Sequence, residues 1–142
     1  MVKAYAQIAA VLFAVLGIGG FFTGDAGHVV AGQAYGNIDG VTLHLTYTRD
    51  VLNIVLALLF GYAAWRAPAT SAWIPAAAAG AILLLLAIVG FVVGDDAAGS
   101  RSVANLHFPA AINVLDLVTG TLALLTVLGD LGEPAATAGS RG

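Results

Sequence analysis

The sequence predicts an all-α integral membrane protein, a bundle of four transmembrane helices made of two duplicated helical hairpins. The membrane class follows from composition, because 60% of the 142 residues are hydrophobic and 9% are charged. Such a composition lies well outside the range of soluble domains. Apolar runs of the roughly 20 residues needed to cross a bilayer core of about 30 Å recur through the chain. Two patterns that each occur twice predict the duplication.

The first repeated pattern opens the second and fourth predicted helices. Residues 43–55 read LHLTYTRDVLNIV, and residues 106–118 read LHFPAAINVLDLV, 63 positions later. The ends of the first and third predicted helices also match, as GFFTGD at 20–25 and GFVVGD at 90–95, 70 positions apart. The offsets differ because the first loop is longer. We therefore expect the duplication to cover whole hairpins, residues 4–66 and 72–129.

The first predicted hairpin starts with an apolar helix over residues 4–22. Its positive start and apolar core resemble a signal peptide, but its length favours a membrane span. Residues 23–42 form a Gly-rich loop that is long for a helix connection and is expected to fold back over the bundle. His28, in this loop, is expected to be solvated.

The second predicted helix has an ambiguous start. Residues 51–65 form an uncharged run that is short for a span, whereas a start at residue 45 is long enough but places Arg49 and Asp50 inside the helix. The repeat favours the longer version, because the fourth predicted helix covers residues 108–128. The third predicted helix covers residues 72–93.

The basic residues predict the orientation. Lys3, Arg66 and Arg141 fall on one side with both termini, and the loops on the other side are mainly acidic, with Arg101 as their clear cation. The positive-inside rule then places both termini of a multi-pass cell-membrane protein in the cytoplasm. Residues 1–129 form the membrane domain, and residues 130–142 form a polar tail that is expected to be disordered or partner-bound.

Five polar residues are expected to form an intramembrane cluster. A carboxylate in a transmembrane helix costs about 2.5–3.5 kcal/mol on insertion scales, so it should face the bundle interior and find a partner. Residues three apart share a helix face. If the second and fourth helices meet across a pseudo-two-fold axis, the inverted order of acid and amide predicts two hydrogen bonds. These bonds would join Asp50 to Asn113 and Asp116 to Asn53.

Arg49 is the fifth member of this cluster, and three roles are open to it. Its side chain can extend to the outer interface, pair with Asp50 or Asp116, or bind an anion in a polar cavity. The repeat offers no second cation, because Ile112 occupies the matching position.

Two further matched features allow different interpretations. Gly20 with Gly24, and Gly90 with Gly94, form Gly-x-x-x-Gly pairs that permit close helix packing in lipid. His44 and His107 could bind a divalent metal with the carboxylates, or ligate a haem. Because each histidine lies six positions before its helical Asp or Asn, the two side chains of each pair fall on different helix faces. Histidines at the helix starts, with no metal or cofactor, are therefore the favoured interpretation.

The chain resembles small bacterial four-helix membrane proteins catalogued as domain of unknown function 4383. In that family the second and fourth helices each carry Asn-x-x-His followed by a Gly. The matching positions here are Asp50-x-x-Asn53 and Asn113-x-x-Asp116, the latter followed by Gly120. The resemblance covers residues 7–129 and implies a four-helix membrane fold, but both family histidines are replaced. It implies no activity.

The sequence favours a structural or accessory membrane protein that self-assembles or joins a larger complex in the lipid bilayer. It shows no nucleophile–base pair or chelating motif that would indicate an enzyme, and no basic cluster that would indicate nucleic acid. A small transporter or channel using the Asp/Asn cluster is the first alternative. A metal- or haem-binding protein built on His44 and His107 is the second.

Overall fold

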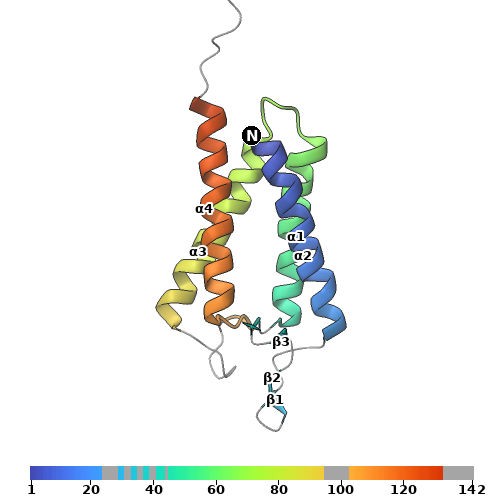
Figure 1. The fold of residues 1–142 in the computed structure, drawn as a ribbon, viewed down its shortest axis with the longest axis vertical. Coiled ribbons are helices and arrows are strands. Elements are labelled where there is room, and N and C mark those ends of the chain that lie inside the picture. The colour runs from blue at the N-terminus through green and yellow to red at the C-terminus, as the bar shows by residue number, and fades with distance from the viewer. Residues whose placement is uncertain are drawn as a thin grey trace, which may run out of the picture.

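Helices make up most of the described chain in the computed structural model. The structure describes residues 1–23, 29–30, 33–34, 37–38, 41–43, 45–94 and 103–132. The helices are α1 (Val2–Thr23), α2 (Tyr47–Gly61), α3 (Trp73–Val93) and α4 (Ala110–Gly132), and a π-helical turn, η1 (Tyr62–Arg66), extends α2. Figure 1 shows the start of α1, the end of α4 and the α2–α3 connection at one end of the bundle.

Short strands lie between α1 and α2, where the sequence predicted only a loop. β1 (Val29–Val30) pairs antiparallel with β2 (Gln33–Ala34), and β3 (Asn37–Ile38) pairs antiparallel with β4 (Val41–Thr42). The remaining loop residues, including His28 and Gly24, lie outside the described chain. The expectation that this loop folds back over the bundle therefore stays a prediction.

Three of the described helices, α1, α3 and α4, are long and apolar enough to cross a membrane. α2 is shorter and less apolar, with 15 residues against the roughly 20 that a span needs. The π-helical turn continues it without a break as far as Arg66, with the Ala67 N–H donating to the Tyr62 carbonyl at 2.8 Å. The longer version of this helix is thus close to what the chain forms.

The four helices are arranged as neighbouring pairs around a central axis. α1 packs along α2, and α3 packs along α4, while α1 also contacts α4 and α2 contacts α3. α2 and α4 therefore lie on a diagonal of the bundle, and their backbones are not the close neighbours that the sequence interpretation required. Only long side chains can connect them directly.

The core is apolar towards the end of the bundle that holds the start of α1. Phe13 stacks on Phe60 with ring centroids 6.0 Å apart, and Tyr5 meets Phe60 edge-on at 5.9 Å. α3 and α4 approach closely at two glycines, where a Cβ added to Gly120 would lie 3.0 Å from the Gly80 carbonyl oxygen. Such close backbone contact is how small residues hold helices together in lipid.

Helix ends are set by local chemistry. Thr46 caps α2, because its hydroxyl accepts the Arg49 N–H at 3.2 Å. α3 ends at Gly94, whose φ of 87° suits glycine. Gly94 therefore ends the helix, and its predicted role in helix packing stays a prediction. α4 continues to Gly132 and so includes Asp130, which the predicted domain boundary placed in the tail; this carboxylate accepts the Val2 N–H at 2.9 Å.

Candidate functional site: a buried polar cluster between the hairpins

The polar cluster occupies the half of the bundle that lies next to the capped start of α2. All five predicted members are buried, and none exposes more than 2% of its surface. The buried face of α2 carries Arg49, Asp50 and Asn53 and continues with Leu56 and Phe60. The other two members, Asn113 and Asp116, are buried on α4.

Arg49 and Asp116 form a bidentate ion pair across the diagonal between α2 and α4. Arg49 Nη1 donates to Asp116 Oδ2 at 2.9 Å, and Nη2 donates to Oδ1 at 2.5 Å. Both side chains are almost fully buried, at 1% and 0% exposure. Two parallel bonds to a planar guanidinium are the strongest form of carboxylate pairing. Of the roles open to Arg49, pairing with Asp116 is confirmed, and extension to the interface is wrong because the side chain is buried.

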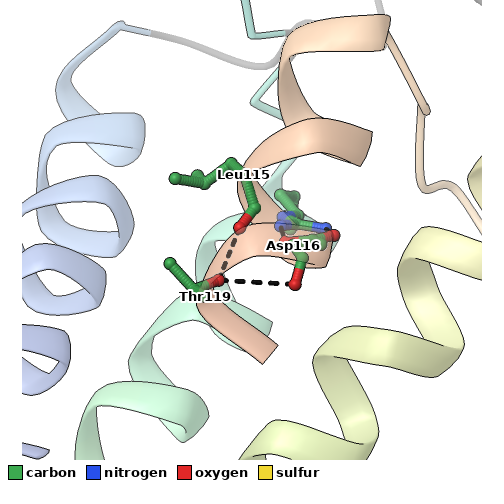
Figure 2. A network of polar contacts seen from close by, with 4 residues as sticks. Leu115, Asp116 and Thr119 are labelled. Carbon is green, nitrogen blue, oxygen red and sulfur yellow. Dashed lines mark hydrogen bonds and ion pairs between the residues drawn. The ribbon is translucent and has the colours of Figure 1, made fainter. Parts of the chain in front are cut away.

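A second set of bonds, one turn beyond Asp116, connects α4 to α1. The Thr119 hydroxyl donates to the Leu115 carbonyl at 2.5 Å and lies 3.5 Å from the Asp116 carbonyl, as Figure 2 shows. The Thr119 carbonyl in turn accepts the Tyr5 hydroxyl of α1 at 2.5 Å. Thr119 follows Asp116 by three positions and so shares its face, which is the signal that could have identified it from the sequence.

Asp50 and Asn113 point away from each other, each towards the other helix of its own hairpin. A Cβ added to Gly20 of α1 would overlap the Asp50 carboxylate, and one added to Gly90 of α3 would overlap the Asn113 amide. The two glycines therefore leave space for a polar side chain of the neighbouring helix. The space at each glycine is filled by a side chain, so the predicted close approach of helix backbones at Gly20 and Gly90 stays a prediction.

The predicted exchange of hydrogen bonds between Asp50 and Asn113, and between Asp116 and Asn53, is wrong. Asn113 Nδ2 donates to the Phe108 carbonyl at 3.1 Å, and Asp116 uses both oxygens on Arg49. The physical reason is the diagonal placement of α2 and α4, which short carboxylate and amide side chains cannot span. The longer arginine side chain can.

Asn53 is a buried amide of the cluster that makes no side-chain hydrogen bond within the described chain. It is fully buried, and neither its amide oxygen nor its nitrogen has a hydrogen-bond partner among the described residues. Its position corresponds to Asp116 in the repeat, and Ile112 corresponds to Arg49. Asp116 thus pairs with a cation from the opposite hairpin, whereas the repeat supplies no second cation for Asn53. Buried polar groups without partners are rare and costly.

The start of α2 is tied to the chain before α4 by a tight turn that sequence reasoning missed. Val103 and Leu106 bond to each other through both backbone groups, and Ala104 and Asn105 between them have positive φ values of 54° and 60°. The Asn105 carbonyl accepts the Thr46 hydroxyl at 2.7 Å. This turn places His107 in a buried position, at 5% exposure.

The two matched histidines differ in whether the structure describes them. His44 lies outside the described residues, so its distance from His107 is not defined. Within the described ranges, no group of three or more His, Cys, Asp or Glu side chains comes together in a way that could hold a metal ion. The metal and haem alternatives therefore stay predictions.

Comparison with known proteins gives no relative for this chain. No family model matches it, and no curated protein and no solved structure matches it either. The resemblance to the four-helix family of unknown function therefore stays a prediction.

Proposed function

We propose that this chain is a small structural or accessory integral membrane protein, and that it assembles with itself or with a larger membrane complex. The observation that carries the proposal is the Arg49–Asp116 pair. Its two charges neutralise each other inside the bundle, and both carboxylate oxygens are already used. The ion pair links the two hairpins, and we propose that it fixes their register.

The apolar half of the core supports the same function. Phe13, Leu56, Phe60 and Leu83 are fully buried and belong to one hydrophobic cluster. This packing closes the centre of the bundle between the polar cluster and the end that holds the start of α1. A solute that reached the cluster would have to open this core to pass further, which favours a structural over a transporting bundle.

The proposed topology has four membrane spans, with α2 and η1 together forming the second, and both termini in the cytoplasm. The exposed aromatic residues Tyr62, Trp65 and Trp73 gather near Arg66, where such rings sit at a membrane interface. The hairpins are proposed to descend from a duplicated ancestor. Gly20 beside Asp50 and Gly90 beside Asn113 occupy matching positions of the two halves, which supports this origin.

A small transporter or channel is the second candidate, and Asn53 favours it. Its buried amide could bind a polar solute or ion that enters beside the cluster. Reconstituted liposomes loaded with a pH- or cation-sensitive dye would separate the two functions. The structural proposal expects wild-type liposomes to leak at the rate of empty ones, and an Asn53-dependent flux would favour the transporter.

The direct experiment on the structural proposal is a mass measurement in lipid. The chain should be extracted into lipid nanodiscs directly from its native membrane and its particle mass determined. We expect a discrete multiple of the 14.3 kDa chain, or a defined complex with another membrane protein. A single copy with no associated protein across several lipid-to-protein ratios would count against the proposal.

A further inference from the structure

An apolar groove runs along the outer surface of the first hairpin, between α1 and α2. It measures about 780 Å³ and extends to Arg66 at the end of η1. Small residues, buried or half-buried, line its floor, and larger apolar side chains such as Val11 and Leu58 are exposed at its rim. The small residues of the floor are Ala10, Ala14, Ala57 and Gly61.

The shape of the groove suits an extended hydrocarbon chain. Its lining on α2 and η1 runs from Ile54 to Arg66, which is about 18 Å at a rise of 1.5 Å per residue. The exposed rim is continuous with the lipid-facing surface of the bundle. A narrow apolar channel of this length that opens to the bilayer along its side accepts an acyl chain without removing any polar group from water.

The charge at one end of the groove indicates which headgroup the occupant carries. Arg66 is exposed and has no ion-pair partner among the described residues, and Tyr62 and Trp65 lie beside it. A guanidinium binds phosphate oxygens in a bidentate manner. Tyrosine and tryptophan sit at the level of lipid headgroups. A phospholipid whose phosphate binds Arg66 would thus place an acyl chain over the groove floor.

The groove's charged end also lies at the end of the bundle where anionic lipid is expected. Lys3 and Arg66 lie at the same end as the start of α1, which the positive-inside rule assigns to the cytoplasm. The cytoplasmic leaflet carries the negative surface potential to which basic residues near the surface respond. A second copy of the chain is a poorer occupant, because the same concave surface on two copies cannot fill itself across a two-fold axis.

We propose that the groove between α1 and α2 is a binding site for one anionic phospholipid, with its phosphate on Arg66 and an acyl chain over Ala14 and Ala57. This site goes beyond the structural function proposed above and does not depend on it. The bundle can assemble with or without a retained lipid, and a lipid can be retained by a bundle of any stoichiometry.

The test is native mass spectrometry of the full chain released from nanodiscs that contain equal amounts of phosphatidylglycerol and phosphatidylcholine with identical acyl chains. One retained basic contact near the surface is worth roughly five-fold in affinity. We therefore expect wild-type protein to retain phosphatidylglycerol about five-fold more than phosphatidylcholine. Arg66→Gln should bring this ratio to near one. Lys3→Gln removes a charge at the same end but outside the groove, so it should leave most of the preference for phosphatidylglycerol.

The acyl-chain contact is tested by filling the groove. Ala14→Phe should reduce retention of both lipids, whereas Ala81→Phe, on the exposed surface of α3, should not. Tryptophan fluorescence and thermal unfolding in phosphatidylcholine discs identify variants that fail to fold, and Arg66→Gln tests the headgroup contact independently. Equal retention of the two lipids by wild type, an unchanged ratio in Arg66→Gln, or full retention by folded Ala14→Phe would each overturn the proposal.

Discussion

Replacing Asp116 by Asn would leave the Arg49 guanidinium charged, buried at 1% exposure, and without its counter-ion. Two scales apply to such a loss. Interhelical polar contacts in membranes average about 0.6 kcal/mol and reach about 1.7, whereas removing one partner of a buried ion pair costs about 3–5 kcal/mol. The second scale applies here, because the cost comes from the uncompensated charge rather than from the lost contact.

We expect Asp116→Asn to cost about 3 kcal/mol, near the lower end of that range, because an amide oxygen can still accept one of the two bonds. Asp116→Leu should cost more. The double variant Arg49→Leu with Asp116→Leu should be within about 1 kcal/mol of wild type, since replacing a whole buried pair by apolar residues is often neutral or stabilising. The double-mutant cycle therefore has a large coupling energy.

The assay is reversible unfolding in mixed detergent micelles with increasing dodecyl sulfate, followed by the fluorescence of Trp65 and Trp73. Leu117→Ala, beside Asp116 but exposed, serves as the control for a change on α4 outside the core. If Asp116→Asn costs less than about 1 kcal/mol, or if the double variant loses as much as the two single variants together, the ion pair does not hold the hairpins together.

Two further predictions use the same unfolding assay. Gly20→Ala and Gly90→Ala should each lower the unfolding free energy by about 1–3 kcal/mol through overpacking against Asp50 and Asn113. Gly19→Ala, where an added Cβ meets nothing within 4 Å, is the matched control and should be neutral or better; equal losses at all three positions would contradict this geometry. Asn53→Leu should leave stability unchanged or raise it, because the side chain gives up no hydrogen bond to the described residues, and a loss above about 1 kcal/mol would show that the amide is bonded.

The sequence was informative about which residues are buried. The insertion cost of Asp50 and Asp116 predicted that both face the bundle interior, and both are fully buried. Residue spacing also predicted that the polar groups of α2 share one face, as do those of α4. These inferences need only helix periodicity and the energy of a charge in hydrocarbon, and both act within a single helix.

The partners of those residues were not predictable in the same way. Whether Asp50 meets Asn113 or fits against Gly20 depends on how four helices are arranged and rotated around their common axis. Matched positions predicted an approach of α2 to α4, but the diagonal arrangement leaves room only for Arg49 to reach Asp116. Side-chain length decides the pairing, and its effect becomes visible only when the spacing of the helices is known.

The most direct measurement of the central claim compares the assemblies formed by wild type and by the charge-free variant, Arg49→Leu with Asp116→Leu. Both proteins should be extracted into lipid nanodiscs from their expression membrane, and their particle masses and associated proteins determined. If the ion pair acts only within the bundle, where an apolar pair can replace it, the folded variant will form the same assemblies as wild type. A folded variant that has lost its partners would contradict the account, because the cluster would then be part of the functional site itself.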